Sequence, residues 1–398
     1  MKFSSKIVKC PLSPIRKFEP SADMARAKNH KIYHLNIGQP DIPTPPAFFE
    51  AVKAFDTPVL SYAPSPGIPV FVSATLEYFA RLGISLNAKN ILTTVGGSEA
   101  LGITLSTILD DGDELLVPEP YYPNYSTLAA MAGASIRPIP TSPEEGYRYA
   151  VREKILPLIN ENTRAILITS PGNPTGNVLS AEEMRVIADI AKEKSLFLIS
   201  DEVYREFIYT GGKMSSMLEF DDIYENTIVI DSVSKRFSAC GARVGVIVSR
   251  NPEFMTQAMK IVQTRLSVAT LDQVGSAALY NNVDDEYFKS VRAEYKLRRD
   301  AALSKLSEIP GIVSEKPDGA FYIMAKLPVD SSEKLLKFLL EEFDDSGETV
   351  MFAPGSGFYA SPGKGISEAR MAYVLAKPDL ERALELLKLG IEAYNSQS

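Results

Sequence analysis

Between residues 90 and 250 the chain repeats one pattern, in which short apolar runs rich in β-branched residues alternate with segments of helical periodicity. The runs are residues 90–95, 114–117, 165–169, 196–200, 227–231 and 244–248. Runs that are apolar throughout are typical of strands buried on both faces. Strands that alternate with helices indicate parallel pairing, because a crossover helix returns the chain to the same end of the sheet. The sequence therefore predicts an α/β fold with a mostly parallel sheet flanked by helices.

One of the intervening helices has both a start signal and an apolar face. Ser180 and Glu183 have the spacing of a capping box, in which the Ser180 hydroxyl and the Glu183 carboxylate satisfy each other's backbone N–H groups. The apolar positions that follow at helical spacing are Met184, Ile187, Ala188 and Ala191. We expect this helix to cover one face of the sheet.

The pattern changes on both sides of this region. Residues 38–46 carry four prolines, so this stretch is predicted to be an extended arm or linker. Residues 252–308 are largely helical, with a long helix over 284–308, and a smaller α+β unit follows. Its expected elements are strand 319–326, helix 331–343, strands 349–353 and 369–374, and a final helix with Leu380, Ala383, Leu384 and Leu387 on one stripe. The predicted parts are residues 1–45, an N-terminal arm and part of the small domain, 46–285, a large domain, and 286–398, the small domain.

Scarce residue types exclude several kinds of chemistry. The chain has two His, two Cys and no Trp. His30 and His34 lie in a polar stretch without a third ligand nearby, so a solvated loop or a strand entry is expected there instead of a metal site. Cys10 and Cys240 form no zinc-binding spacing. A Ser–His–Asp triad or a His-ligated metal is thus disfavoured, and the chemistry must come from Lys, Tyr, Asp, Glu, Arg or a bound cofactor.

Charge and hydropathy narrow the partners and the location. With 42 Lys and Arg against 50 Asp and Glu, the formal net charge is −8, which argues against nucleic acid and anionic membranes as partners. No apolar run approaches the roughly 18 residues of a membrane span. The N-terminus lacks the apolar core of a signal peptide. Two distant cysteines fit a reducing compartment, so we expect a cytoplasmic protein.

Candidate functional residues follow the predicted strands, because ligands of α/β sheets bind beyond the carboxyl ends of the strands. After residues 90–95 come Gly96, Gly97, Ser98 and Glu99 at the start of a helix, where backbone N–H groups can bind an anion. A tight turn without a ligand is the alternative. Tyr122 follows residues 114–117 and is either a stacking ring or a core tyrosine.

The next strands are followed by more reactive groups. Asn173 lies in a rigid turn after residues 165–169, and Asp201 and Tyr204 follow residues 196–200. An acid at this place is also a common helix cap. After residues 227–231 come Ser232, Ser234, Lys235 and then Arg243. A lone lysine is usually only solvated, but one within a hydroxyl-rich strand exit can act as an amine nucleophile.

Together these groups describe one ligand. The ligand is planar, so that it can stack on Tyr122, and it has an oxygen that Asn173 and Tyr204 can contact. It also has a ring nitrogen that can pair with Asp201 and an aldehyde that can react with Lys235. Its phosphate would be held by Gly97, Ser98, Ser232, Ser234 and Arg243. Pyridoxal 5′-phosphate (PLP) has all of these groups, and a lysine with an acidic partner for the ring nitrogen is the signature of its enzymes.

The order of these motifs resembles that of the class I/II aminotransferases of PLP fold type I, the aspartate aminotransferase family. The matching motifs, spread from Gly38 to Arg370, are Gly38-Gln39-Pro40-Asp41, Tyr62-Ala63-Pro64, Gly96-Gly97-Ser98, Pro171-Gly172-Asn173-Pro174-Thr175-Gly176, Ser200-Asp201-Glu202-Val203-Tyr204, Ser232-Val233-Ser234-Lys235, Gly241-Ala242-Arg243 and Gly319-Ala320-Phe321-Tyr322. The resemblance implies a large PLP-binding domain, a smaller α+β domain, and amino transfer from an L-amino acid to a 2-oxo acid, with 2-oxoglutarate expected as acceptor.

The resemblance also implies roles for single residues. Lys235 would hold the cofactor as an aldimine and move the Cα proton, Asp201 would pair with the ring nitrogen, and Tyr204 would complete the catalytic set. The implied cofactor-binding set is Gly97, Ser98, Glu99, Tyr122, Asn173, Asp201, Tyr204, Ser232, Ser234, Lys235, Arg243 and Tyr62. Arg370 would bind the substrate α-carboxylate, with Gly38 and Asn173 in the same subsite. Tyr62 matches a tyrosine that reaches the neighbouring subunit, which implies a homodimer with shared active sites.

The chain departs from the family pattern at a few positions, which leaves the amino donor open. Tyr122 stands where many relatives have Trp, and Cys240, Ala242 and residues 70–72 also differ. A lyase on the same fold remains an alternative, either a C–S lyase or one similar to aminocyclopropane-carboxylate synthase. A PLP-sensing DNA-binding regulator is disfavoured, since the residues before the core contain no basic helix–turn–helix.

Overall fold

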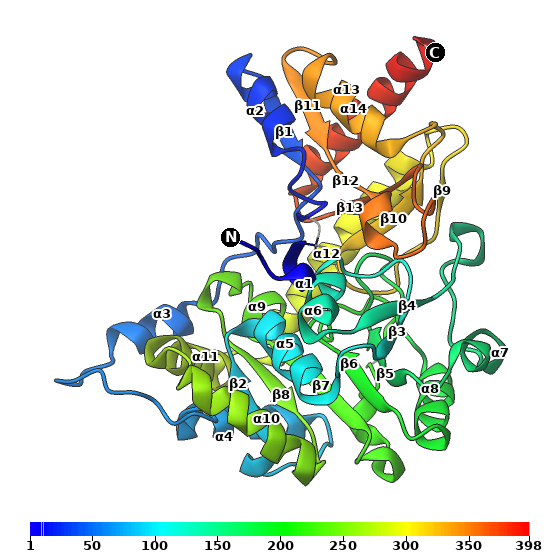
Figure 1. The fold of residues 1–398 in the computed structure, drawn as a ribbon. Coiled ribbons are helices and arrows are strands. Elements are labelled where there is room, and N and C mark those ends of the chain that lie inside the picture. Colours follow the sequence, from blue (N-terminus) through cyan, green and yellow to red (C-terminus); the bar gives the residue numbers. More distant parts are fainter. Residues whose placement is uncertain (9, 11, 213, 398) are drawn as a thin grey trace.

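The computed structural model describes residues 1–398 except 9, 11, 213 and 398 (Figure 1). Its largest sheet has seven strands in the order β2-β8-β7-β6-β5-β3-β4. They are β2 (Ile91–Thr94), β3 (Glu114–Pro118), β4 (Ser135–Ile139), β5 (Thr163–Thr169), β6 (Phe197–Asp201), β7 (Thr227–Ser232) and β8 (Gly245–Val248). All neighbours pair in parallel except β8, which is antiparallel to both β2 and β7. The predicted mostly parallel α/β sheet is confirmed.

Helices cover both faces of this sheet. Side chains of successive strand residues point to opposite faces, so Leu198 of β6 packs in one core cluster and Ile199 in another. The first cluster includes side chains of α4 (Pro69–Arg81), α8 (Ala181–Glu193) and α11 (Thr270–Asn282). The second includes side chains of α5 (Gly96–Ile108), α6 (Asn124–Ala132) and α10 (Pro252–Arg265). The sheet is therefore the middle layer of three.

Helix α8 has the predicted cap and face. The Ser180 hydroxyl accepts the N–H of Glu183 at 3.1 Å, and the Glu183 carboxylate accepts the N–H of Ser180 at 2.8 Å. The apolar residues predicted for its inner face are buried, namely Met184, Ile187, Ala188 and Ala191. The other short or peripheral helices are α1 (Ser5–Val8), α3 (Pro46–Lys53), α7 (Arg152–Ile155) and α9 (Val233–Arg236).

A second, smaller unit lies above the large sheet in Figure 1, and the long helix α12 (Asp285–Leu306) leads to it. Its four-stranded sheet has the order β12-β13-β10-β9. The elements are β9 (Val313–Ser314), β10 (Tyr322–Lys326), α13 (Ser332–Glu341), β11 (Glu348–Met351), β12 (Ala353–Pro354), β13 (Glu368–Ala372) and α14 (Lys377–Ser396). The stripe predicted on the final helix is buried in the core of this unit.

Several elements differ from the sequence-based expectation. The single strand predicted over residues 349–353 is wrong, because the segment divides between two sheets. Strand β11 pairs in parallel with β1 (Lys31–His34), whereas β12 pairs with β13. Strand β4 and helix α2 (Glu19–Ala27) were not predicted, whereas β1 lies where a strand entry was one of the two expectations for His30 and His34. Residues 38–45 form neither helix nor strand, as their prolines indicate.

Among the described residues, none of the helices combines the length and the apolar character that crossing a bilayer requires. His30 directly precedes β1 and His34 ends it, so the two histidines lie at a strand, which is one of the two expected placements. The His34 ring nitrogen Nδ1 lies 3.2 Å from the side-chain oxygen of Asn36.

Candidate active site

A cavity of about 500 Å³ lies between the seven-stranded and the four-stranded sheet, at the edge where β5, β6 and β7 end. Of the residues predicted for the site, those on its wall are Gly38, Gly97, Ser98, Tyr122, Asn173, Asp201, Tyr204, Ser232, Ser234, Lys235, Arg243 and Arg370. Arg243 precedes its strand instead of following it. Since β8 runs antiparallel to β7, the amino end of β8 meets the carboxyl ends of the parallel strands.

Lys235 projects into this cavity from the one-turn helix α9. Ser232, the last residue of β7, caps that helix by accepting the N–H of Ser234 at 3.3 Å. The Lys235 ammonium donates to the backbone oxygen of Gly38 at 2.9 Å and lies 3.7 Å from the Cys240 sulfur. The amine therefore faces the linker that crosses the cavity.

Asp201 ends β6 as a buried carboxylate. It accepts a hydrogen bond from the Tyr125 hydroxyl at 2.7 Å and the N–H of Val203 at 3.4 Å. Burial raises its pKa to about 6, although both hydrogen bonds favour the charged form. The Tyr125 hydroxyl also lies 2.7 Å from that of Thr169. Sequence reasoning missed Tyr125, although it follows Tyr122 at helical spacing in the same segment.

An anion-binding corner forms where helix α5 begins. Gly96 has φ of 74°, and a Cβ there would lie 2.4 Å from a guanidinium nitrogen of Arg243. A Cβ at Gly245 would lie 2.7 Å from the Gly96 backbone, so β8 passes directly against the helix start. The Arg243 guanidinium donates to the backbone oxygens of Cys240 at 2.9 Å and Val95 at 3.4 Å. Glycine at these positions thus allows a cation and free helix N–H groups to meet.

The opposite wall of the cavity presents Arg370 from β13. Its guanidinium donates to the Asn173 side-chain oxygen at 3.0 Å and to the Asn36 backbone oxygen at 2.6 Å. Its Nε is buried and has no hydrogen-bond partner in the described structure. The ring of Tyr322 lies 4.6 Å from the guanidinium. A guanidinium held this way can still bind a planar carboxylate.

Two tyrosine hydroxyls meet beside this arginine. Those of Tyr204 and Tyr322 lie 2.9 Å apart. Burial raises the pKa of Tyr204 well above its usual value, so the hydroxyl stays protonated and can donate to a ligand oxygen.

The structure does not bring two of the predicted residues to the cavity wall. The Glu99 carboxylate accepts the N–H of Val95 at 2.6 Å and pairs with Arg265, with 3.3 Å between its Oε1 and the arginine Nε. Glu99 therefore stabilises the start of α5. Tyr62 lies between α3 and α4 and is 84% exposed. Figure 1 shows that this connection extends away from the rest of the chain.

The N-terminal segment contributes residues that sequence reasoning missed. Ser13, Ile15 and Arg16 line the cavity. The Arg16 guanidinium makes no ion pair or side-chain hydrogen bond with the described residues. Burial raises the pKa of Tyr122, and the positive charge of Arg16 nearby opposes that shift. Arg16 is thus an exposed cation at the cavity wall that has no counter-charge among the described residues.

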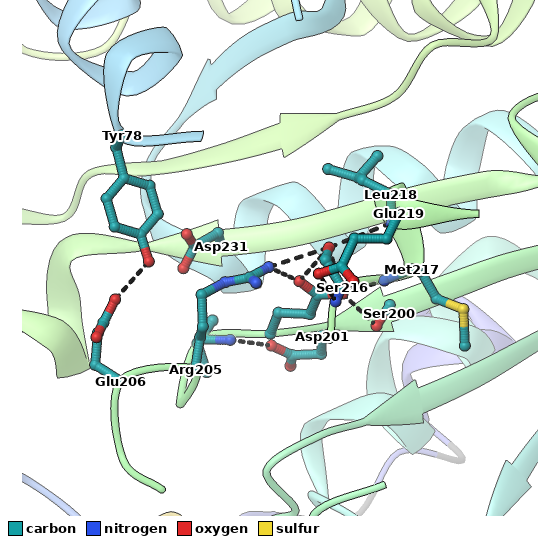
Figure 2. Close-up of polar contacts among 12 residues, drawn as sticks. Tyr78, Ser200, Asp201, Arg205, Glu206, Ser216, Met217, Leu218, Glu219 and Asp231 are labelled. Carbon is teal, nitrogen blue, oxygen red and sulfur yellow. Dashed lines mark hydrogen bonds and ion pairs between the residues drawn. The ribbon is translucent and has the colours of Figure 1, made fainter. Parts of the chain in front are cut away.

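A buried polar network lies behind Asp201 (Figure 2). The carboxylate of Glu202, the next residue, accepts the hydroxyl of Ser200 at 2.9 Å and the N–H of Met217 at 3.1 Å, and it pairs with Arg205. Figure 2 shows Arg205 directed toward Ser216, whose hydroxyl also donates to Glu202, at 2.9 Å. These contacts fix the backbone that carries Asp201.

The residues present fit the groups of PLP. A buried carboxylate, an amine, a donor-rich corner and a guanidinium with an unpartnered buried Nε share one cavity. The carboxylate suits a protonated ring nitrogen, since an opposing cation would compensate its desolvation. The hydroxyls, helix start and Arg243 suit a phosphate.

Comparisons with known proteins point to one family. The sequence model of the family described as aminotransferase class I and II matches residues 30–386. An aspartate aminotransferase of Pyrococcus horikoshii is 32% identical over 371 residues, which cover 92% of either chain. Aromatic-amino-acid aminotransferase 2 of Thermococcus litoralis is 32% identical, with 90% of this chain and 91% of that protein covered. The structure of a single mutant of Thermus thermophilus aspartate aminotransferase is 28% identical, has a TM-score of 0.89, and covers 98% of this chain and 100% of its own.

Proposed function

The chain belongs to the class I and II aminotransferase family, and we propose that Lys235, Asp201 and Arg370 form its active centre with PLP as cofactor. The activity is the transfer of an amino group from an amino acid to a 2-oxo acid. The observation that carries the proposal is that a single cavity holds the amine, the buried carboxylate and the carboxylate-binding guanidinium. Residues from β6, α9 and β13 are needed together for this arrangement.

In this proposal, each polar group of the cofactor would have a partner in the cavity. Asp201 would hold the ring nitrogen, Asn173 and Tyr204 the ring oxygen, and Tyr122 would pack against the ring. The phosphate would be held by Gly97, Ser98, Ser232, Ser234 and Arg243. When bound, PLP withdraws electrons from the substrate Cα and so makes the Cα proton acidic.

The chain's own residues then orient the substrate and move its proton. Arg370 binds the α-carboxylate in a bidentate manner, which fixes the direction of the Cα–H bond. The amine of Lys235 takes the proton from the substrate Cα. It then returns the proton to the cofactor carbon that is bonded to the transferred nitrogen. Asp201, held by Tyr125, keeps a negative charge opposite the ring nitrogen.

Replacing Lys235 tests this assignment. In Lys235→Ala we expect no amino transfer from any donor to 2-oxoglutarate, and no PLP fixed to the protein by borohydride. The matched control is Lys334→Ala, because Lys334 is an exposed lysine paired with Asp330 on the small unit. If the wild type released ammonia or thiol from an amino acid without a 2-oxo acid acceptor, the result would support a lyase instead. Amino transfer by Lys235→Ala would refute the proposal.

A dicarboxylic substrate is the best-supported choice of donor and acceptor. If Arg370 binds the α-carboxylate and Arg243 the phosphate, Arg16, which has no ion-pair partner among the described residues, is left to bind a second carboxylate. Aspartate and 2-oxoglutarate carry such a group, whereas alanine does not. Aspartate is also the substrate in the names of two of the relatives above.

Arg16→Gln tests the substrate assignment. We expect the KM for aspartate and 2-oxoglutarate to rise about tenfold, while the KM for alanine changes less than about twofold, because only the dicarboxylates lose an ion pair. Lys17→Gln is the control, since the Lys17 ammonium pairs with Glu333 outside the cavity. An equal change for alanine would contradict the assignment.

A second copy of the chain is the proposed partner. Val59, Leu60 and Tyr62 are exposed on the same connection, at 67%, 61% and 84%. Apolar side chains gathered in this way favour contact with another protein surface. Tyr62 would then reach the phosphate in the partner's cavity, so that each active site is shared.

The division into domains and the location are also proposals. Residues 46–285 would form the large PLP-binding domain, and residues 1–45 would join 286–398 in the small one. The pairing of β1 with β11 supports this division. A cytoplasmic location is supported by Cys10 and Cys240 being free thiols.

A further inference from the structure

The turn that carries Lys235 lies between two oppositely charged residues that face the core. Asp231 precedes the capping residue Ser232, and Arg236 follows Lys235. A guanidinium nitrogen of Arg236 lies 2.6 Å from the Asp231 carboxylate, and the side chains are 1% and 0% exposed. The other Asp231 oxygen accepts the N–H of Ser232 at 2.7 Å. One ion pair therefore closes the loop of chain that holds the cavity lysine.

Arg236 also ties this turn to the helices behind it. It donates to the hydroxyl of Tyr280 in α11 at 2.8 Å, and it lies 4.0 Å from the centre of the Tyr78 ring in α4. Figure 2 shows Asp231 near Tyr78, whose hydroxyl donates to Glu206 at 2.6 Å. Lys235 and Arg236 are adjacent, yet the first lines the cavity and the second is fixed in the core.

Stability alone does not account for such a pair. Buried ion pairs can often be replaced by apolar residues of similar volume without loss of stability, because desolvation offsets their attraction. The surroundings here include the aromatic rings of Phe237 and Tyr280. Arg236 also faces Glu206, with 3.9 Å between its Nε and a carboxylate oxygen, but Glu206 has a second partner in Arg292 at 3.4 Å and would stay paired beside an apolar pair. Unlike an apolar pair, a hydrogen-bonded ion pair requires a particular direction of its two side chains. It therefore favours one arrangement of the turn over others.

The Asp231–Arg236 ion pair also affects Asp201. The charge of Asp231 is one of the causes that raise the pKa of Asp201. Arg236 compensates that charge at 2.6 Å. The charge state of Asp201 is thus sensitive to whether the Asp231–Arg236 ion pair is intact.

We propose that Asp231 and Arg236 are positioning residues for the reaction, whose ion pair orients α9 so that the Lys235 amine faces the substrate Cα. The inference rests on the proposed function of Lys235. Neither residue lines the cavity, so both act through Lys235 and not by touching substrate.

The double variant Asp231→Asn/Arg236→Met separates orientation from stability, because it removes both charges and keeps the volumes similar. In the holoenzyme we expect kcat to fall about 100-fold with the KM for the amino donor within about threefold. We also expect the pH at which the absorbance of bound PLP changes to shift by about one unit, because the Asp201 carboxylate opposite the ring nitrogen would lose the neighbouring charge of Asp231. Borohydride fixation on the Lys235 peptide, measured by mass spectrometry, should slow in parallel.

Arg236→Lys is the second variant and keeps a cation beside Asp231. A single ammonium cannot contact Asp231 and Tyr280 with a planar fork, so we expect a fall in kcat of about tenfold, with the same spectral shift in smaller measure. This variant keeps the test decisive if the double variant does not fold.

Arg299→Met is the matched control, because Arg299 is also 1% exposed but lies in α12, where it donates to the Pro317 backbone oxygen. It should lower the unfolding temperature and leave kcat and the absorbance unchanged. If the folded variants of the pair keep kcat and the absorbance of the wild type, or if the control loses as much kcat, the positioning role is refuted. Absence of PLP fixation in the wild type would instead refute the proposed function.

Discussion

At Asp201 burial and hydrogen bonding act in opposite directions. The side chain is 6% exposed, and its loss of hydration outweighs the hydrogen bonds from Tyr125 and Val203, which leaves the pKa at about 6. A carboxyl that ionises with difficulty in the cofactor-free protein would ionise readily opposite a cationic ring nitrogen. The site is thus prepared for a bound cation.

This burial predicts a pH dependence of stability for the cofactor-free protein. The folded pKa of about 6 exceeds the ordinary value of 3.8, so the folded state binds more protons between these values and stability falls as the pH rises through them. The loss amounts to about 3 kcal/mol above pH 6. We expect Asp201→Asn to abolish this loss. The free energy of unfolding of the variant in urea, relative to that of the wild type, should therefore rise by about 3 kcal/mol between pH 4 and pH 7.

Saturating PLP provides the control for that measurement. It should remove the loss from the wild type, since the ring nitrogen would stabilise the charged carboxylate. A difference between variant and wild type that does not change with pH would contradict the raised pKa of Asp201.

Single residues of the site could be predicted where they lie at or just beyond the end of a strand. Asp201 ends β6 and Lys235 comes three residues after β7, so the apolar runs mark the edge at which both must lie. Tyr125 could not be linked to Asp201, since 76 positions separate them. Glu99 was placed with Ser98 by sequence proximity, but neighbours on a helix point about 100° apart, and Glu99 turns away from the cavity.

Elements were predictable where local chemistry determines them. The α8 capping box is such a case, because all of its partners lie within four residues. The split of residues 348–354 between two sheets was not predictable, since β11 pairs with a strand more than 300 positions earlier. Strand β4 was missed because Arg137 and Pro138 interrupt its apolar pattern, which an edge strand tolerates.

The cap of α8 gives a prediction at this scale. We expect Ser180→Ala to lower the free energy of unfolding by about 1 kcal/mol, because the N–H of Glu183 loses its partner. Ser290→Ala is the control, since Ser290 is exposed within α12 and caps nothing. Urea unfolding of both variants checks the effect, and equal stability of the two would contradict it. Amino transfer should not change, because α8 contributes no residue to the cavity.

At the scale of the whole molecule, strand order assembles the site. The antiparallel direction of β8 could not be inferred from its apolar run alone, yet it brings Arg243 to the same edge as Asp201 and Ser232. Arg370 and Arg16 come from outside the large sheet. The cavity therefore exists only when the N-terminal segment, the large sheet and the small unit are folded together.

The exposed Tyr62 gives the prediction that belongs to this scale. If it acts on the partner's phosphate, Tyr62→Ala should weaken PLP binding about tenfold through the loss of one charge-assisted hydrogen bond. Lys235→Ala should be inactive. A dimer of two Tyr62→Ala chains would then lack Tyr62 in both sites, and a dimer of two Lys235→Ala chains would lack Lys235 in both. Neither would have an intact site at limiting PLP.

Mixing the two variants by unfolding and refolding together restores one intact site in each hybrid dimer. Lys235 of that site comes from the Tyr62→Ala chain, and the Tyr62 that reaches it comes from the Lys235→Ala chain, while the other site carries both substitutions. We expect activity at limiting PLP to rise above the sum of the separate variants, toward about a quarter of the wild type, because random pairing makes half of the dimers hybrids. If Tyr62 acted within its own chain, every hybrid site would lack either Lys235 or Tyr62, and mixing would give no gain. The experiment thus decides between a shared and a self-contained active site without any assumption about which amino acid is the donor.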